Sequence, residues 1–577
     1  TAAVRAQLTQ ARPELGSAFG WRVRTLGLEQ ARDFRRGVAL ADSVAHKTKV
    51  ARMRALAYAR AGRMRLQLND SAGARKSLLA AAEASVASDG AREAADQLSH
   101  FKALRASELR TLARVARARG QSSTALRYYR QARQKMRPGD ERARLVLETG
   151  RLLFASRQYD ALRKELKPLA RGSGALAGEA QLLIGRAELR DRNGQAAISA
   201  LRRSLASKAS SRTRLEAAFL IADLAQDAAN SKDADSYFRR VIALAPHSEH
   251  AALAYMRRGG AAYARGDFKK ATEIFQAFGT VQKGRDHAAQ AKYWLARSLA
   301  ETGDSARSRV LLTEISQGEP YSYYGVLARR VTGGAPPLPA AGPESTPEAL
   351  RAAVTRARVV RLLRELDLDD AASFEAGSAR EALKAMPGGS HAYAEAVQKL
   401  GGNAAGIEVG RQILAEGEWN SRLLRIVYPF PYRNVISREA RKNGLKPDFV
   451  AAFIRQESMF EPRARSRAGA LGLMQLMPQT ARALRKGVSE SELLEPDVNI
   501  RIGSAHLRAL LQEYGGHTER LIAAYNAGGT PVTRWSKFPE SRDPQLFVER
   551  IPYDETREYV KIVQRNAWLY SWLYDTE

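Results

Sequence analysis

The sequence predicts a mainly α-helical protein in three parts: an array of helical hairpins, a small helical domain and a C-terminal domain of about 150 residues. Residues 1 to about 330 are rich in Ala, Leu and Arg and poor in Pro, and their apolar residues recur at helical spacing. Breaks in this pattern return about every 37 residues, a period typical of helical-hairpin arrays. Two proline-rich segments then interrupt the helical pattern and divide the rest of the chain.

The breaks between hairpins are short turn sequences such as Asn193-Gly194, Gly266-Asp267 and Gly303-Asp304. Small and aromatic residues precede them, as in Ala262-Tyr263, and these aromatics are expected in the core because each hairpin must stack on its neighbours. Before Gly120 the period is less regular. We expect no catalytic residue in this array, which taken alone predicts a scaffold that binds proteins or peptides.

Two boundaries follow from proline and glycine. The run from Gly333 to Pro343 cannot be helical and predicts a semi-extended linker, after which Thr346-Pro347-Glu348 has the pattern of a helix start. Two further prolines interrupt the helical pattern between Tyr428 and Tyr432. The predicted domains are therefore residues 1–332, 347–427 and 428–577.

The chain is strongly basic. Lys and Arg outnumber Asp and Glu by 93 to 61, a net charge of +32, and the basic residues are spread along the whole sequence. This charge predicts an acidic partner. Nucleic acid is disfavoured because the sequence has no zinc-finger spacing, basic zipper or aromatic RNA-binding signature. An anionic polymer of another kind fits the same charge.

Several classes of site and location are also disfavoured. The absence of cysteine excludes disulfides, thiolate catalysis and cysteine-ligated metal, and the pair His247 and His250 has no third ligand in view. No apolar run reaches the roughly 20 residues that span a bilayer. The first residues show no signal peptide, so we expect a mature or trimmed form.

Residues 447–480 contain the candidate catalytic acid. Pro447 and Asp448 suit the first turn of a helix, on which Phe453 and Glu457 fall on one side. Glu457 is therefore expected to point toward the core, where poor solvation should raise its pKa and keep it protonated near neutral pH. A general acid needs that state, although spacing alone leaves a solvated or capping role open.

Three groups of residues carry a resemblance to a known family. The first is Glu457-Ser458, Ser466, Gly469-Ala470, Gly472-Leu473-Met474-Gln475 and Met477-Pro478. The second is Ala524-Tyr525-Asn526-Ala527-Gly528 with Val532 and Arg534-Trp535, and the third is Ile551-Pro552-Tyr553 with Glu555-Thr556-Arg557 and Tyr559-Val560. In this order they resemble the motifs of the bacterial soluble lytic transglycosylases. Glu461 differs from the shorter Asn or Asp usual before the proline, which affects only the local turn.

The resemblance implies an N-terminal α-superhelical ring of helical-hairpin repeats, a small helical linker domain and a lysozyme-like catalytic domain with one small sheet. It also implies cleavage of the β-1,4 bond between N-acetylmuramic acid and N-acetylglucosamine in peptidoglycan, with a 1,6-anhydromuramic acid product. The anionic polymer would then be the peptidoglycan glycan strand, and the location the periplasm. Cell-wall proteins could bind the repeats, and no cofactor or metal is required.

The matched positions also imply roles for residues of the site. Glu457 would act as acid and then as base. The implied substrate-binding residues are Ser466 and Gln475, which would orient the sugar, Met477, which would line the groove, Tyr525 and Asn526, which would engage the N-acetyl group, and Glu555, which would position substrate or balance charge.

Alternatives remain open from the residues alone. A lysozyme-like hydrolase would need a second carboxylate near Glu457. The candidates for that carboxylate are Glu461, Asp497, Asp543, Asp554 and Glu555. Tyr525 could be a buried aromatic with a satisfied hydroxyl, Glu555 could pair with Arg557 or cap a helix, and Met477 could belong to the core.

Overall fold

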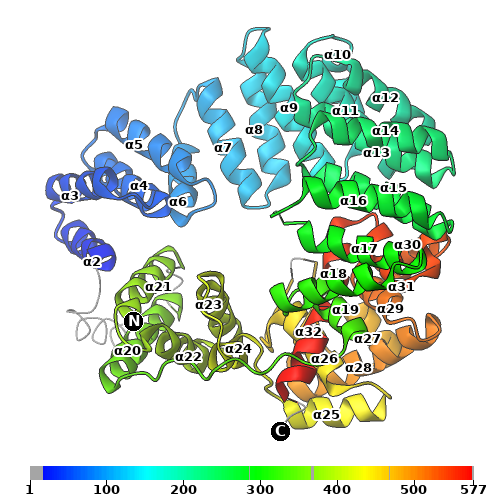
Figure 1. Ribbon diagram of the computed structural model, residues 1–577. Coiled ribbons are helices and arrows are strands. Elements are labelled where there is room, and N and C mark those ends of the chain that lie inside the picture. Colours follow the sequence, from blue (N-terminus) through cyan, green and yellow to red (C-terminus); the bar gives the residue numbers. More distant parts are fainter. Residues whose placement is uncertain (1–16, 285, 366–368, 467, 575–577) are drawn as a thin grey trace. The chain divides into compact units, whose positions relative to one another are not determined.

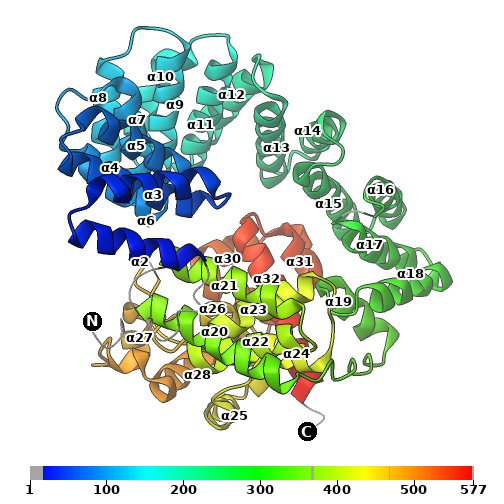
Figure 2. The same ribbon diagram turned by 90° about the vertical axis from the view of Figure 1, so that its left-hand side faces the viewer.

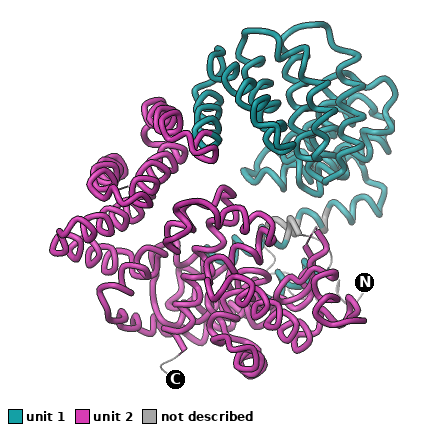
Figure 3. Tube along the Cα trace, turned by 90° about the vertical axis from the view of Figure 1, so that its right-hand side faces the viewer, with its two compact units in different colours: residues 1–224, 355–382 teal, residues 225–354, 383–577 magenta. Residues whose placement is uncertain are grey.

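The computed structural model describes residues 17–284, 286–365, 369–466 and 468–574, and these are predominantly helical (Figure 1). They form two compact units, residues 1–224 with 355–382 and residues 225–354 with 383–577 (Figure 3). The first residues of the chain, where we expected no signal peptide, lie outside the described ranges. None of the helices described has the length and apolar character needed to cross a membrane.

The first unit is built mainly from the repeat helices, which pack as successive antiparallel neighbours. It also includes residues 355–382, which are most of α20 (Pro347–Glu365) and α21 (Asp369–Lys384). Its repeat helices are α2 (Ser17–Gln30), α3 (Phe34–Lys47), α4 (Ala51–Gln67), α5 (Ser71–Ala84), α6 (Asp89–Leu98), α7 (Ala106–Ala118), α8 (Ser122–Gln134), α9 (Asp140–Ala155), α10 (Tyr159–Ala170), α11 (Ala175–Arg190), α12 (Gly194–Ala206) and most of α13 (Ser211–Asp227).

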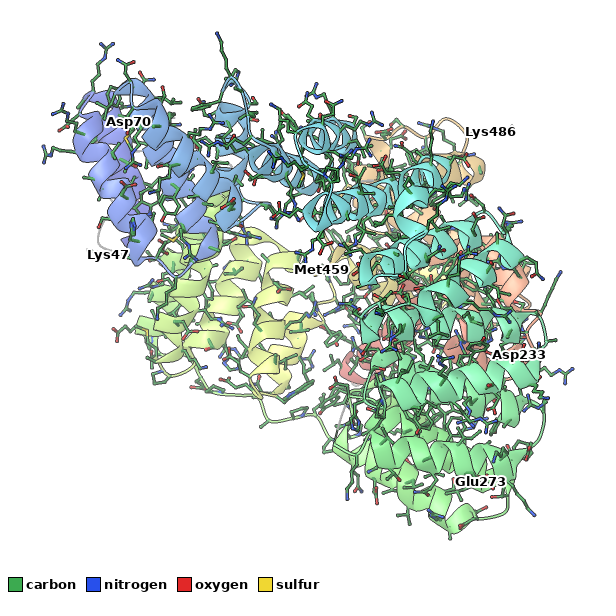
Figure 4. The ribbon with its side chains drawn as sticks, turned by 90° about the horizontal axis from the view of Figure 1, so that it is seen from above. Lys47, Asp70, Asp233, Glu273, Met459 and Lys486 are labelled. Atoms are coloured by element: carbon green, nitrogen blue, oxygen red, sulfur yellow. The ribbon has the colours of Figure 1, made fainter. Side chains whose placement is uncertain are left out.

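The hairpin turns share one backbone conformation. A residue with positive φ follows one helix, and the next residue caps the start of the following helix, as Asn69 and Asp70 do before α5 (Asp70 is labelled in Figure 4). The Asp70 side chain accepts a hydrogen bond of 2.8 Å from the backbone N–H of Gly73, a cap worth about 1 kcal/mol. The positive-φ residue recurs every 37 residues from Arg192 to Gly303, which confirms the predicted period over this stretch.

Close approach of the two helices explains a second recurring feature. A Cβ on Gly259 would lie 2.5 Å from the ring of Phe275, so only glycine fits opposite that side chain. The two residues are 16 positions apart, and the same spacing separates a glycine from a bulky residue in other hairpins. These pairs are Gly62 and Leu78, Gly150 and Leu166, and Gly185 and Leu201.

The second unit begins with the last repeats, which continue as a row of packed helices (Figure 2). A small group of helices follows, and then the C-terminal region. The repeat helices are α14 (Ser231–Leu244), α15 (Glu249–Ala264), α16 (Phe268–Val281), α17 (Ala288–Glu301), α18 (Ser305–Gly318) and α19 (Tyr323–Thr332). Within the second unit this group comprises the first residues of α20, the last residues of α21, α22 (Gly389–Gly401), α23 (Asn403–Ala415) and α24 (Ser421–Val427).

The C-terminal region is also helical. Its helices are α25 (Arg433–Lys442), α26 (Pro447–Ser458), α27 (Pro478–Leu484), η1 (Glu492–Leu494), α28 (Pro496–Glu513), α29 (Thr518–Ala527), α30 (Gly529–Trp535), η2 (Pro539–Arg542), α31 (Pro544–Arg550) and α32 (Asp554–Tyr574). Where we expected a small sheet, the described residues form isolated antiparallel bridges that join Leu471 to Arg465 and to Leu476.

The last repeats and the C-terminal region share a core. Tyr263 and Trp294 are buried, as predicted for the aromatics of the repeats, and Leu546 of α31 packs into the same cluster. Beside it, the buried carboxylate of Glu549 accepts hydrogen bonds from Gln290 at 2.8 Å and from Tyr324 at 2.5 Å. Contacts of this kind cross the predicted boundary at residue 428.

The proline-rich linker is extended, as predicted, and hydrogen bonds from the C-terminal helix and from α24 hold it. Trp572 donates a hydrogen bond of 2.8 Å to the carbonyl of Pro336, and the Ser421 N–H bonds to Ala340 at 2.9 Å. The predicted helix start at Pro347 is also confirmed. On α20, Leu350 and Val354 are exposed, whereas Ala349, Ala353 and Leu363 are among the buried residues.

Candidate active site

Glu457 lies in the last turn of α26, which begins at Pro447 as the sequence predicted. One turn earlier, Phe453 is fully buried, so the helix directs this face toward the core of the C-terminal region. After Ser458 the helix ends, because Met459 (labelled in Figure 4) and Phe460 have φ values of 51° and 64°. Left-handed conformations cost energy in residues other than glycine, and such strain is often found at functional sites.

Tyr559 of α32 is the direct partner of the Glu457 carboxyl group. Its hydroxyl donates a hydrogen bond of 2.5 Å to Glu457 Oε1. Burial raises the pKa of Glu457 to about 7, and the bond from Tyr559 works in the opposite direction by stabilising the carboxylate. Burial also raises the pKa of Tyr559 well above its usual value, so this phenol keeps its proton and remains a donor.

The segment after α26 is held against the end of that helix. Ser458 Oγ donates a hydrogen bond of 2.7 Å to the carbonyl of Leu473. Gln475, whose φ is 47°, donates through Nε2 to the carbonyls of Gly472 at 2.9 Å and Ala464 at 3.2 Å. The Gln475 side chain therefore stabilises the turn in which it lies.

Asn499 of α28 is a fully buried amide that the sequence interpretation missed. Its Oδ1 accepts a bond of 2.8 Å from the N–H of Met474, and its Nδ2 donates to the carbonyls of Leu471 and Leu493 at 3.0 and 2.7 Å. A Cβ on Gly472 would approach Asn499 Nδ2 to 2.3 Å, so this glycine is required for the contact. No local pattern marks Asn499, since its partners lie elsewhere in the sequence.

The predicted residues of the second motif also meet this segment. Tyr525 donates a hydrogen bond of 2.6 Å to the carbonyl of Met474, and its ring lies edge-on to Phe453 with the centroids 4.9 Å apart. The hydroxyl is thus satisfied within the protein, as the structural alternative predicted. Asn526 Oδ1 accepts a hydrogen bond of 2.7 Å from Thr556, which joins the second and third motifs.

The remaining predicted residues are more exposed. Ser466 Oγ accepts a hydrogen bond of 2.9 Å from the N–H of Ala470 within its own turn. Met477 is 42% exposed at the start of α27, which excludes the alternative that it belongs to the core. Glu555 is exposed in the first turn of α32, four residues before Tyr559 and hence on the same helix face.

Four of the five candidate second carboxylates, all except Glu555, have other partners. Asp543 pairs with Arg297 at 2.7 Å, and Asp554 pairs with Arg557 at 2.6 Å. The alternative that Arg557 pairs with Glu555 is therefore wrong: Asp554 is the carboxylate that bonds this guanidinium. Asp497 pairs with Arg438 at 3.2 Å, and Glu461 Oε1 accepts a backbone bond from Arg463.

Comparison with known proteins shows what the residues around Glu457 are similar to. The transglycosylase SLT domain family matches residues 434–548, which contain Glu457 and the first two motifs. The chain carries a transglycosylase SLT domain. Glu555 and Tyr559 lie just after the matched residues, so the contact between Tyr559 and Glu457 joins the SLT domain to the final helix.

The SLT domain is accompanied by wider similarity to the soluble lytic transglycosylases. The soluble lytic murein transglycosylase of Salmonella typhimurium is 31% identical over 284 residues, which are 47% of this chain and 42% of that protein. The match thus spans less than half the length of this curated relative.

Solved structures extend the similarity to the fold. The lytic transglycosylase Slt of Pseudomonas aeruginosa matches 99% of this chain and 89% of its own, with a TM-score of 0.63 and 20% identity. For the 70-kDa soluble lytic transglycosylase of Escherichia coli the coverages are 99% and 96%, with a TM-score of 0.58 and 20% identity. The predicted family resemblance and the mainly α-helical fold class, with a superhelical repeat region and a lysozyme-like domain, are confirmed.

Proposed function

We propose that this chain is a lytic transglycosylase that cleaves peptidoglycan between N-acetylmuramic acid and N-acetylglucosamine, with Glu457 as the single acid and base. The main support is the Glu457 carboxyl group, whose pKa is about 7 and which accepts a hydrogen bond from Tyr559. A carboxyl group with this pKa can be protonated when substrate binds and can lose its proton within the same cycle. Because the relative from Salmonella typhimurium acts on murein, we also propose peptidoglycan as substrate and the periplasm as location.

The proposed cycle begins with protonated Glu457. It donates its proton to the glycosidic oxygen, and the bond between that oxygen and C1 of the muramic acid breaks while the N-acetyl oxygen bonds to C1. The Glu457 carboxylate then accepts the proton of the 6-hydroxyl, whose oxygen attacks C1 and displaces the N-acetyl oxygen. The tethered hydroxyl reacts without water, and Glu457 ends the cycle protonated.

The other predicted residues are proposed to position the sugar. Tyr525 bonds the loop carbonyl of Met474, so it would shape the wall beside Glu457 and approach the N-acetyl group with its ring. Asn526, held by Thr556, would act beside it. The exposed side chains of Met477 and Glu555 are available to contact substrate, and Ser466 and Gln475 are proposed to orient it from their turn.

Product analysis tests this proposal. Mass spectrometry of a digest of purified peptidoglycan should show muropeptides that end in 1,6-anhydromuramic acid. A lysozyme-like hydrolase would instead release reducing muropeptides heavier by one water, and that result would contradict the transglycosylase assignment. A scaffold protein would release no muropeptide at all.

Replacement of Tyr559 by Phe should move the pH dependence of the reaction. In the parent, kcat/KM should fall as pH rises through about 7, because Glu457 loses the proton that it must donate. The bond from Tyr559 lowers the pKa of Glu457, so Tyr559→Phe should raise this pKa and shift the falling limb to higher pH. The measurement is a pH profile of kcat/KM for both proteins.

Tyr570→Phe on the same helix is a matched control. It also removes one buried phenol, but the hydroxyl of Tyr570 bonds to the carbonyl of Pro429 and not to Glu457. The fall of kcat/KM with rising pH should occur at the same pH in Tyr570→Phe as in the parent. An unshifted limb in folded Tyr559→Phe would show that this phenol does not set the protonation of Glu457.

A further inference from the structure

A cavity of about 980 Å³ lies in the first unit, between α10, α11 and α12. Several small residues line it, among them Ala177 and Gly178 of α11. Cations line its walls, and no carboxylate is found among the described residues that line it. The cationic side chains are Arg163, Lys164, Lys167, Arg171, Arg203 and Lys208.

The helices around the cavity are joined by buried hydrogen bonds. Gln181 of α11 donates a bond of 2.7 Å to the carbonyl of Ala170 at the end of α10. Ser204 of α12 donates a bond of 2.8 Å to the carbonyl of Gly178 on α11. A Cβ on Gly178 would lie 1.9 Å from Ser207 Oγ, so the approach of α12 to α11 requires this glycine. The cavity is therefore a fixed feature of the repeats.

Most of the cations in the walls are not neutralised by neighbouring acids. Arg163 is the exception, since it pairs with Asp160 and Asp191. Lys164, Lys167, Arg171 and Lys208 are exposed, and none of these side chains pairs with a carboxylate of a described residue.

Favourable interaction with helix dipoles explains the positions of only some of these cations. Lys167 and Arg203 lie in the last turns of α10 and α12, where cations are favourable. Lys164 lies one turn earlier, and Arg171 and Lys208 follow the helix ends. Because these cations surround one cavity, charge complementarity favours an anionic ligand there.

We propose that this cavity binds the stem peptides of peptidoglycan through their carboxylates. The inference rests on the proposed function, which supplies a polymer that carries short peptides with several carboxylate groups. The volume of the cavity lies at the upper end of the range for small-ligand sites, so it suits a short peptide rather than the surface of a folded protein. A stem peptide bound here would hold the enzyme on its substrate through contacts outside the SLT domain.

A second cavity in the same unit offers a comparison. It has about 750 Å³, and its lining mixes cations with the carboxylates of Glu83, Asp140 and Glu141. Arg114, Lys135 and Arg137 of this lining are exposed, so they can be replaced without opening the core. Removing these three cations changes the net charge of the chain by the same amount as removing three from the cationic cavity.

The test is isothermal titration of the full chain with the free stem peptide released from purified peptidoglycan by an amidase. The triple variant Lys164→Ala, Lys167→Ala, Arg171→Ala should bind the peptide at least about tenfold more weakly than the parent. The control triple variant Arg114→Ala, Lys135→Ala, Arg137→Ala should bind like the parent. Peptide whose carboxylates have been amidated should lose affinity for the parent.

Four results would overturn the inference: no binding by the parent, equal weakening in both triple variants, undiminished binding of the amidated peptide, or equal affinity for hexaglutamate. The last would indicate a site for acidic peptides in general. These failures can be told apart from failure of the proposed function. A parent that makes anhydromuropeptides without binding stem peptide contradicts only this inference, and a parent that binds stem peptide without making them contradicts only the proposed function.

Discussion

The variant Glu457→Gln should lose activity on peptidoglycan by about 100-fold to 10,000-fold, the usual contribution of a general acid or base. Gln keeps the shape of the side chain and can accept the hydrogen bond from Tyr559, but it has no proton to donate to the glycosidic oxygen. The measurement is the rate of muropeptide release by purified protein. A variant that keeps more than about a tenth of the parent rate would exclude Glu457 as the catalytic acid.

Glu461→Gln is the matched control. Glu461 lies in the turn after α26, and its Oε1 accepts a backbone hydrogen bond from Arg463 that the Gln side chain can also accept. This variant should keep a rate close to that of the parent. A large loss in Glu461→Gln would favour a second carboxylate and hence the hydrolase alternative.

Folding of Glu457→Gln can be checked by its stability as a function of pH. The pKa of Glu457 is raised from 4.5 to about 7 in the folded protein, so the folded state binds more protons than the unfolded state between these values. The free energy of unfolding of the parent should therefore fall as pH rises from about 4.5 to 7, by up to about 3 kcal/mol from this group. The Gln variant lacks this loss and should be the more stable protein at pH 8, as measured by denaturant unfolding.

Lys561→Met should lower the free energy of unfolding by about 3–5 kcal/mol, the usual cost of removing one partner of a buried ion pair. Lys561 of α32 bonds to the Glu549 carboxylate at 3.2 Å and to the Tyr324 hydroxyl at 3.0 Å. Glu549 is 6% exposed, and this burial by itself would raise its pKa. The pKa is nevertheless below its usual value, and the positive charge of Lys561 makes the largest contribution to lowering it. The measurement is the urea midpoint of the full chain.

Two controls test the cause of this loss. Lys537→Met removes an exposed lysine of the same region and should change stability by no more than about 0.5 kcal/mol. Adding Glu549→Gln to Lys561→Met should recover part of the loss, because the buried group is then neutral. If Lys561→Met were as stable as Lys537→Met, the pair would not contribute to the packing of the repeats against the C-terminal region.

The expected loss should also depend on pH. The pKa of Glu549 is lowered in the parent, so the stability that this carboxylate contributes is present above its unfolded pKa and is lost as pH falls. Without Lys561, burial should raise this pKa and let Glu549 take up a proton more readily. The difference between parent and Lys561→Met should therefore become smaller toward acid pH.

Local sequence determined the helical elements and one part of the site. The 37-residue period, the turn at Asn69 and Asp70, and the start of α26 at Pro447 all follow from residues within a few positions of one another. Helical spacing, caps and turn conformations are set by such neighbours, so they can be predicted without knowledge of the fold. The same spacing predicted that Glu457 faces the core and has a raised pKa.

The partners of these residues were decided only by the tertiary structure. Tyr559 bonds to Glu457 across 102 positions in the sequence, and Asn499 bonds to Met474 across 25. Glu549 is buried where the last repeats meet α32, and its bond from Tyr324 spans 225 positions. Such contacts depend on how whole helices pack, and no local pattern carries that information. The sequence therefore identified the acid, while packing determined which groups set its protonation.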